Sequence, residues 1–403
     1  MTDEKLLEGI RVLDLTSVVV GPATTLRLVD LGATVMKVET PEGDVMRSLG
    51  GPSHTGRFSG KFLHFNRGKR FIALDLKTPA GLEAMHRLLA TCDVFVSNIR
   101  PEALARLGLD AEACRARQPR LIHCNITGFG PGGPYRGLPA YDTVIQGASG
   151  ITGLTLKRDG APNFVPLLIG DHTVAEITAG HICAALVRRE RSGQGATLEI
   201  PMLETMAAYN LEEHLGPATF SPPLGNPGDT RVLDPHHRPV ATKDGWITLT
   251  ANTDRQAAAF LRTIGRHDLL DDPRFKTVAG RFRHAKDWYG LRVDALRGQE
   301  SAYWLKALAE ADVPAMPCYA LEQVEHDPHL KAVGLLVDEE HPEEGPIRSI
   351  RPTALIDGRN YDLGPPAKPI GADTEAVLAE AGLSADEIAA AVEGRRGPEE
   401  ARA

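Results

Sequence analysis

One aspartate stands where its chemistry could be catalytic. Asp171 follows the apolar stretch Pro166-Leu-Leu-Ile-Gly170 and begins a segment with a helical pattern that continues to Glu190. An aspartate at the start of a helix commonly caps free backbone N–H groups, so a structural role as N-cap explains its position. The same end of a helix also stabilises a charged carboxylate. An ionised carboxylate at the rim of an apolar pocket can act as a nucleophile, and the residues alone leave both roles open.

Positive charge gathers in Asn66-Arg-Gly-Lys-Arg70, with Lys77 shortly after it. The segment between them, Phe71 to Leu76, has the pattern of a buried strand. A solvated loop is the usual environment of such a cluster. Basic side chains just outside parallel strands can also bind phosphate, because ligands of α/β sheets lie at the strand ends. Both interpretations remain open at this point.

A glycine-rich segment, Gly128-Phe-Gly-Pro-Gly-Gly133, has the Gly-x-Gly-x-x-Gly form of a dinucleotide-binding turn. Pro131 and Pro134 interrupt the helix that such a turn must open, and no acidic residue ends a following strand. Glu39 lies near the end of the second predicted strand, where a ribose-binding acid would stand. The turn after the first strand, Thr16 to Gly21, lacks the glycines that let a phosphate approach closely. A dinucleotide site is therefore disfavoured.

Several other classes of site lack their residues. The histidines have no His-x-x-x-His or His-Glu-x-x-His spacing, so we expect no metal site. No Gly-x-Ser-x-Gly indicates a serine hydrolase. The five cysteines are odd in number and contain no Cys-x-x-Cys pair, which argues against a disulfide framework and favours a reducing cytoplasm.

Charge and hydropathy exclude further partners. The formal net charge is -8 and no long basic run occurs, so a nucleic-acid partner is not expected. The acidic first residues predict no secretory signal. The most apolar helical stretch, Thr173 to Val187, is too short to span a bilayer and contains Glu176 and His181. The sequence thus predicts a cytoplasmic protein without a membrane partner.

Strands and helices alternate through the first half of the 403 residues. Strands are predicted at Ile10 to Leu15, Thr34 to Val38, Phe71 to Leu76, Val94 to Ser97 and Leu121 to Ile126. Helices fill the intervals, and Thr78 followed by Pro79 has the form of a helix start. This alternation indicates βαβ units, and so a mostly parallel sheet with helices on its faces.

The second half has a different pattern. We expect 127–170 to be loop with one short helix near Tyr141 to Gln146, and a loop of this length is more often functional than idle. A helix to Glu190, a strand at Ala196 to Ile200 and a helix at Pro201 to His214 follow. The proline- and glycine-rich segment 216–229 marks a linker. Beyond it, a hairpin turning at 243–245 and three helical segments predict a smaller α+β domain, followed by short strands and two alanine-rich helices.

A series of segments, spread in order over nearly the whole chain, has the form of one known family. They are Leu7-Glu-Gly-Ile-Arg-Val-Leu-Asp-Leu-Thr16, Gly21-Pro22, Asp30-Leu-Gly-Ala33, Val35-Met-Lys-Val-Glu39, Gly43-Asp44, 66–77, Asp93-Val-Phe-Val-Ser-Asn98, Arg106-Leu-Gly-Leu109, Pro119-Arg-Leu-Ile122, Ile126-Thr-Gly-Phe-Gly130, Gly170-Asp171 and His326-Asp-Pro-His329. With these segments the chain resembles the family III CoA-transferases (CaiB/BaiF family). That family includes formyl-CoA transferase and has α-methylacyl-CoA racemase as an isomerase relative.

The resemblance implies a fold and an assembly. It implies a Rossmann-like, mostly parallel α/β domain formed by both chain ends, a smaller α+β middle domain, and a homodimer of interlocked chains. The boundaries expected here are 1–215 for the first part of the large CoA-binding domain, 216–235 for the linker, 236–330 for the small domain and 331–403 for the return to the large domain.

The resemblance also implies the site. Asp171 takes the place of the catalytic aspartate. Contacts to coenzyme A fall on Val19, Val20, Leu74, Asp75, Leu76, Lys77, Asn98, Ile99, Arg100, Arg106, Pro139, Ala140, Tyr141 and Asp142, with Lys77 and Arg106 at phosphates. The acyl pocket falls on Ser17, Val18, Val19, Tyr141 and Gly170. No tightly bound cofactor is implied, because coenzyme A enters as a thioester substrate and leaves on a carboxylic acid.

Three departures from the family pattern bear on function. Thr40 replaces a basic residue that helps hold coenzyme A in formyl-CoA transferase, so either Lys37 or Arg47 substitutes for it or that contact is lost. Ser17 and Val19 replace polar residues beside a small diacid, which disfavours oxalate and formate. Tyr141 stands at the position of the racemase's catalytic histidine, and a phenol is a poor base near neutral pH. We therefore expect a CoA-transferase acting through an aspartyl anhydride and an aspartyl-CoA thioester; the alternatives are a racemase-like isomerase and a non-catalytic CoA-binding homologue.

Overall fold

The chain forms two compact units in the computed structural model, which describes residues 5–393. The first unit contains the residues up to 149, residues 165–208 and those from 334 onward, and the second contains 150–164 and 209–333. Each unit has a hydrophobic core of its own. The expected site residues all belong to the first unit.

A six-stranded parallel sheet forms the centre of the first unit, in the order β3-β2-β1-β4-β5-β6. The strands are β1 (Arg11–Leu15), β2 (Thr34–Glu39), β3 (Arg70–Ala73), β4 (Val94–Ser97), β5 (Ile122–Thr127) and β6 (Ala196–Pro201). The predicted parallel α/β sheet is confirmed. Its order reverses between β1 and β4, and in such Rossmann-like sheets ligands bind at the carboxyl ends of the strands beside that point.

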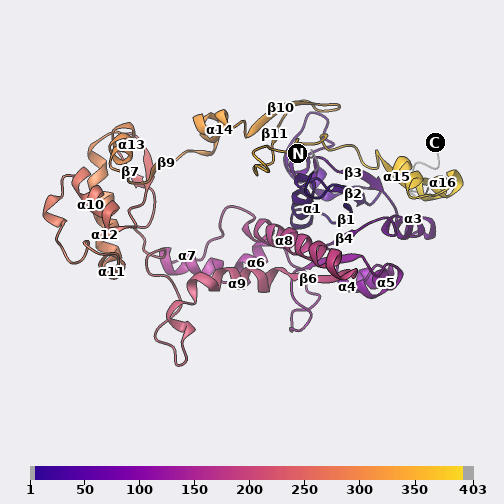
Figure 1. Ribbon diagram of the computed structural model, residues 1–403, viewed down its shortest axis with the longest axis horizontal. Helices are drawn as coiled ribbons and strands as arrows, with labels where there is room; N and C mark the ends of the chain where they lie inside the picture. Colours follow the sequence, from indigo (N-terminus) through magenta and orange to yellow (C-terminus); the bar gives the residue numbers. More distant parts are fainter. Residues whose placement is uncertain (1–4, 394–403) are drawn as a thin grey trace. The chain divides into compact units, whose positions relative to one another are not determined.

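Helices join these strands, as the alternating pattern predicts (Figure 1). They are α1 (Val20–Asp30), α2 (Gly60–Asn66), α3 (Pro79–Leu89), α4 (Pro101–Arg106), α5 (Ala111–Arg117), α8 (Ile169–Ser192) and α9 (Met202–His214). Thr78 caps α3 by accepting a hydrogen bond from the Gly81 N–H, which confirms that predicted helix start. α1 and α8 pack against each other, and Leu13, Met36 and Ile72 share a core with α3.

The predicted loop 127–170 is more ordered than expected. The short helix near Tyr141 is present as α6 (Asp142–Ala148), but a second helix, α7 (Ile151–Asp159), follows it and was not predicted. Gly150 and Gly160 flank α7 with φ values of 86° and 81°, a left-handed conformation that glycine adopts without steric strain. No helix opens at 128–133, in agreement with the rejection of a dinucleotide turn.

The second unit has a small antiparallel sheet, β7-β8-β9, with helices around it. Its elements are β7 (Val240–Ala241), β8 (Trp246–Leu249), β9 (Ala315–Pro317), α10 (Asp254–Thr263), α11 (Val278–Arg283), α12 (Ala285–Ala295), α13 (Ser301–Glu310) and α14 (Pro328–Ala332). The predicted hairpin is confirmed, because β7 and β8 pair antiparallel across 242–245. One of the three predicted helical segments is divided at His284 into α11 and α12.

The last part of the chain belongs to the first unit. It contains the hairpin β10 (Leu336–His341) and β11 (Gly345–Ile350), then α15 (Thr374–Glu380) and α16 (Ala385–Glu393). α16 packs on α3, and Val377 and Leu378 of α15 join the core beside the sheet. Among the described helices, none combines the length and apolar composition needed to cross a bilayer.

Candidate active site

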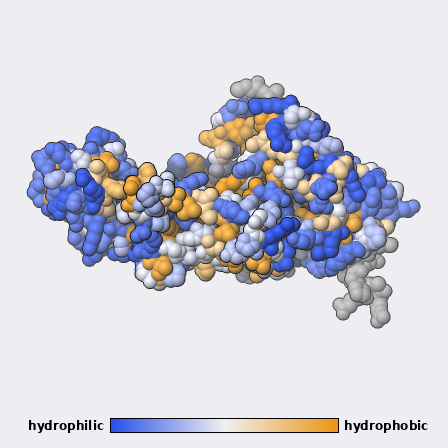
Figure 2. Space-filling model, turned by 90° about the horizontal axis from the view of Figure 1, so that it is seen from below, coloured by the Kyte–Doolittle hydropathy of each residue, from blue (hydrophilic) through white to orange (hydrophobic). Residues whose placement is uncertain are grey.

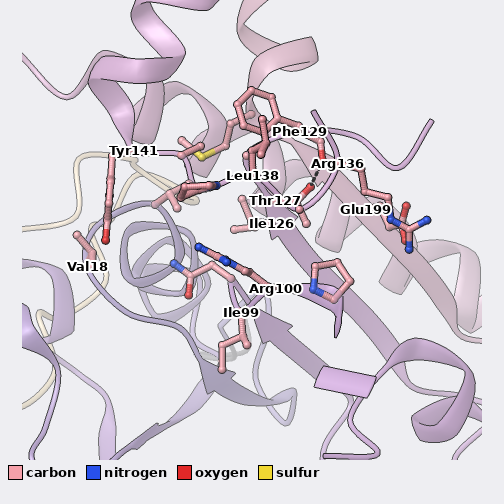
Figure 3. Close-up of a pocket in the computed structure, with 18 of the residues that line it drawn as sticks. Val18, Ile99, Arg100, Ile126, Thr127, Phe129, Arg136, Leu138, Tyr141 and Glu199 are labelled. Atoms are coloured by element: carbon pink, nitrogen blue, oxygen red, sulfur yellow. Dashed lines mark hydrogen bonds between the residues drawn. The ribbon is translucent and has the colours of Figure 1, made fainter. Parts of the chain in front are cut away.

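A cavity of about 270 Å³ lies at the point where the strand order reverses. Its walls come from the residues that follow β1 (Ser17 to Val20) and β4 (Asn98 to Pro101), from the end of β5 and the residues after it (Ile126 to Phe129), and from the loop that ends at Tyr141. Asp171 also lines it. Figure 3 shows Ile99, Ile126, Phe129 and Leu138 around the cavity, with Arg100 crossing it.

The turn after β1 is held in an unusual conformation. Val18 has φ = 69°, in the left-handed region that a β-branched residue rarely adopts. The Asn98 side chain bonds both backbone groups of the preceding residue, accepting from the Ser17 N–H at 3.1 Å and donating to the Ser17 carbonyl at 2.9 Å. The Val18 N–H donates to Asp44 at 3.2 Å. Such a conformation persists only where its surroundings fix it, and it commonly occurs at functional sites.

Buried lysines support this turn from beneath. Lys37 donates to the Thr16 carbonyl at 2.8 Å and to Asp44 at 2.9 Å, and Lys69 donates to Asp14 at 3.1 Å and to the Pro22 carbonyl at 3.1 Å. Both lysines are almost fully buried. Burial opposes ionisation of Asp14, but the two ammonium groups outweigh it and hold its pKa below the usual value. Burial lowers the pKa of Lys69 to about 8 in spite of Asp14.

The basic cluster at 66–70 is therefore neither a solvated loop nor a phosphate site. Asn66 and Lys69 are buried and bond to each other at 2.9 Å, because the Lys69 side chain points inward to Asp14. Arg67 pairs with Asp30 at 2.7 Å, and Arg70 pairs with Glu380. For residues 66–70 both interpretations were wrong, since a sequence pattern does not show that these charges have partners within the fold. Lys77, which was part of the same prediction, stays a predicted phosphate contact.

Neither Lys37 nor Arg47 takes the place of the basic residue that formyl-CoA transferase has at the position of Thr40. Lys37 is held by Asp44, and Arg47 binds both oxygens of Glu39 at 2.8 and 2.7 Å. The Arg47 guanidinium also lies 4.0 Å from the Phe62 ring centre. Neither Lys37 nor Arg47 lines the cavity. The Glu39 carboxylate is bound by Arg47, so it is not available to bind a ribose.

Asp171 is the third residue of α8 and does not cap it. The N-cap position is Leu168, so the interpretation of Asp171 as N-cap was wrong. Asp142 supplies the missing acceptor from another helix, because its Oδ1 accepts from the N–H groups of Gly170 at 2.7 Å and Asp171 at 3.2 Å. Gly170 permits this close approach, since a Cβ there would lie 3.0 Å from the same oxygen.

The Asp171 carboxylate is buried without a cation beside it. Asp171 is 8% exposed, and among the described residues no hydrogen-bond donor or cation acts on the pKa of its side chain. Burial, and then the negative charge of Asp142, raise its pKa to about 7. The group can therefore exchange its proton near neutral pH, and an ionised carboxylate with few hydrogen bonds is a reactive nucleophile. The N–H groups of Gly170 and Asp171, which could have served an oxyanion, are used by Asp142.

The structure brings most of the expected site residues to this cavity. Those that line it are Ser17, Val18, Val19, Val20, Asn98, Ile99, Arg100, Pro139, Ala140, Tyr141 and Asp171. Asp142 and Gly170 stand directly behind Asp171. Those outside the lining are Leu74, Asp75, Leu76, Lys77 and Arg106. Arg136 and Glu199 also line the cavity, and neither was predicted as a site residue. Arg136 lies in the predicted loop 127–170, where no sequence motif distinguishes it.

A second cavity, of about 570 Å³, contains none of the expected residues. It lies between α1, α2, α8 and 350–361. Its acidic and basic groups include Asp30, which pairs with both Arg27 and Arg67. Among residues 5–393, no group of three or more His, Cys, Asp or Glu side chains is arranged to hold a metal ion. The first cavity, with its reactive carboxylate, is therefore the candidate active site.

Comparison with known proteins identifies the family of this chain. The family model for CoA-transferase family III matches residues 7–374. A succinate–glutarate CoA-transferase of Agrobacterium fabrum is 33% identical over 93% of this chain and 95% of its own, and succinyl-CoA:glutarate CoA-transferase of Homo sapiens is 30% identical over 94% and 87%. The crystal structure of a CAIB/BAIF family protein from Brucella suis superposes with a TM-score of 0.78, at 29% identity, over 94% of this chain and all of that one. The chain belongs to the CoA-transferase family III.

Proposed function

We propose that this enzyme moves coenzyme A from an acyl-CoA to a free carboxylic acid, with Asp171 as the nucleophile. The observation that carries the proposal is the Asp171 carboxylate, which lines a cavity at the sheet's reversal point and has a pKa near neutrality. A carboxylate is the nucleophile that this exchange requires, because each step interchanges a carboxylate and a thiolate on an activated acyl group.

The proposed reaction proceeds in four balanced steps. Asp171 attacks the thioester carbonyl, the C–S bond breaks, and a mixed acyl-aspartyl anhydride and CoA thiolate form. The thiolate attacks the Asp171 carbonyl and releases the donor acid, leaving an aspartyl-CoA thioester. The acceptor carboxylate attacks this thioester to give a second anhydride and thiolate, and the thiolate then attacks the acceptor's acyl carbonyl. The new acyl-CoA leaves and Asp171 is again a carboxylate, so no metal or redox cofactor takes part.

The predicted contacts to coenzyme A fall into two groups, one within the cavity at the strand ends and one outside its lining. Val20, Ile99, Pro139 and Ala140 offer apolar contact within the cavity. Lys77 and Arg106 lie outside its lining, where the nucleotide end of so long a ligand could reach them. We retain both as proposed phosphate contacts.

The acyl pocket is proposed to favour an acid less polar than oxalate or formate. Val19 is 1% exposed and packs with Phe62 and Phe71, so the apolar wall of the cavity depends more on Val18 and Ile126. Burying a second carboxylate there without compensating bonds costs several kcal/mol. Because relatives are named for succinate and glutarate, longer diacids belong among the acceptors to be tested. Arg100 crosses the cavity and is the proposed partner of the second carboxylate of such a diacid.

The proposed assembly is an interlocked homodimer, in which the large domain contains 1–215 and 331–403, the linker 216–235 and the small domain 236–330. Exposed apolar side chains support an interface: Tyr209, Phe220 and Leu224 are 55%, 57% and 75% exposed. Figure 2 shows hydrophobic residues gathered in patches on one face. Extended patches of this kind commonly mark contact surfaces. We propose a cytoplasmic location, where the five unpaired cysteines would stay reduced.

A racemase-like isomerase is the second candidate, since that reaction also begins with an acyl-CoA. It requires an acid and a base on either side of the α-carbon, and Tyr141 supplies only a phenol at the cavity. A non-catalytic CoA-binding homologue is disfavoured, because the Asp171 carboxylate lines the cavity and has a pKa near neutrality.

Incubation with a panel of acyl-CoAs and free acids tests the proposal, with new thioesters read by mass spectrometry. We expect at least one pair to exchange coenzyme A in both directions. Epimerised 2-methylacyl-CoA without exchange would favour the isomerase, and binding of acyl-CoA without either product would favour the non-catalytic homologue.

A further inference from the structure

We propose that Arg136 binds a phosphate group of coenzyme A at the side of the cavity opposite the reactive aspartate. This inference rests on the proposed function, because it assigns a further binding residue for the same substrate. Arg136 is a member of the loop between β5 and α6, and it is one of the residues that line the cavity.

The loop that carries Arg136 is fixed at its base. The Gly130 N–H donates to Glu204 at 2.8 Å, and the Gly128 carbonyl accepts from the Leu203 N–H at 3.0 Å. The two ends of the loop also touch, since a Cβ on Gly128 would lie 2.4 Å from the Ala140 Cβ. Arg136 is therefore held beside the cavity by a loop that is anchored to α9 and closed on itself.

The cavity has a reactive side and a distal side. Figure 3 shows Val18 and Tyr141 on one side, Arg136 and Glu199 on the other, and Arg100 between them. Asp171 belongs to the Tyr141 side, because its N–H bonds to Asp142, the next residue along the chain from Tyr141. In an acyl-CoA the pantetheine arm separates the thioester from the phosphates. A thioester at Asp171 thus directs the phosphates toward Arg136.

Arg136 is also available to an anion. Its side chain is 59% exposed, and its ion pair with Glu102 is long, at 3.8 Å. An exposed pair of this kind contributes little, so a phosphate can replace Glu102. Arginine binds phosphate through two parallel N–H···O bonds that are stronger than neutral hydrogen bonds. Lys37 and Arg47, by contrast, are held by buried carboxylates.

Titration calorimetry with coenzyme A on wild type, Arg136→Ala and Arg120→Ala tests this assignment without requiring turnover. Arg120 is the matched control, because it is 54% exposed, pairs with Glu190 at 3.4 Å and lies outside the cavity lining. We expect Arg136→Ala to weaken coenzyme A binding by about tenfold, and Arg120→Ala to leave it within twofold. Glu102→Gln removes the competing carboxylate and is expected to bind coenzyme A more tightly than wild type does.

Truncated ligands identify the phosphate. With an acyl-pantetheine, which has no phosphate, wild type and Arg136→Ala are expected to share one kcat/KM. If the difference between the two proteins persists with dephospho-CoA, the contact is the diphosphate; if it disappears, the contact is the 3′-phosphate. Equal affinity of wild type and Arg136→Ala for coenzyme A overturns the inference, as does an equal loss with acyl-pantetheine. A wild type that binds no coenzyme A overturns the proposed function itself.

Discussion

Replacing Asp171 by asparagine should abolish CoA transfer and at the same time stabilise the fold at alkaline pH. The amide has nearly the same shape as the carboxylate but is a far poorer nucleophile. It also removes a buried charge that has no cation beside it. The opposite signs of these two effects separate a catalytic role from a structural one, because a residue kept for stability loses both when it is changed.

The size of the stabilisation follows from the raised pKa. Burial and Asp142 move the pKa of Asp171 from 3.8 to about 7. The folded protein therefore retains a proton that the unfolded chain releases, so its stability falls as pH rises from about 4 to about 7 and is level above that. The whole change is about 4 kcal/mol, of which about 3 kcal/mol falls between pH 5 and pH 8. With an unfolding entropy of roughly 0.85 kcal/mol/K for a chain of this length, that part corresponds to ~3 °C in Tm.

Thermal unfolding of wild type and Asp171→Asn at pH 5 and pH 8 measures this effect. We expect the Tm of the variant, relative to that of wild type, to rise by ~3 °C between the two pH values. Asp362→Asn, at an exposed position, is the control and should show no such change. A Tm difference that does not depend on pH, or that moves in the opposite direction, would refute the inference that Asp171 is a buried, uncompensated carboxylate.

Four further results are expected. In Asp142→Asn, the loss of a neighbouring negative charge lowers the pKa of Asp171, so the acidic limb of the kcat/KM profile should move to lower pH; an unmoved limb would contradict the contact. A 2-methylacyl-CoA in deuterated buffer should show no catalytic exchange of its α-proton, and rapid washout at neutral pH would favour the isomerase. Among oxalate, succinate, glutarate, mesaconate, butyrate and a longer branched acid, oxalate should be a poor acceptor. A kcat/KM for oxalate tenfold above those of the monocarboxylates, about 1.4 kcal/mol in transition-state binding, would contradict the proposal of an apolar acyl pocket. Tagged and untagged protein should not exchange subunits within minutes under native conditions, whereas free exchange would exclude interlocked chains.

Much of the sheet could be predicted from the sequence because its signals are local. Buried strands such as Val94–Ser97 are short apolar runs, and Thr78 with Pro79 marks a helix start. The alternation of strands and helices then fixes the parallel arrangement. α7 was missed because its helix lacks a clear apolar stripe, and only Gly150 and Gly160 mark its ends.

The candidate site was less predictable, because long-range partners decide what each charge does. Asp171 was identified through resemblance, but the sequence does not show that Asp142 caps its helix from 29 positions away and raises its pKa. Lys69 has the appearance of a surface cation, yet it is buried against Asp14. Arg136 shows the reverse, since it stands in a loop with no distinguishing pattern and reaches the cavity only through the fold.

During the proposed reaction, Asp171 becomes covalently attached to the acyl group of the donor. The most direct measurement is peptide mass spectrometry of wild type and Asp171→Asn after incubation with an acyl-CoA and hydroxylamine, which traps activated carboxyl groups. We expect a hydroxamate on the wild-type peptide that contains Asp171, no modification of the variant, and no acyl transfer by the variant. Transfer by Asp171→Asn at a near wild-type rate, with deamidation excluded by the peptide mass, would contradict the account.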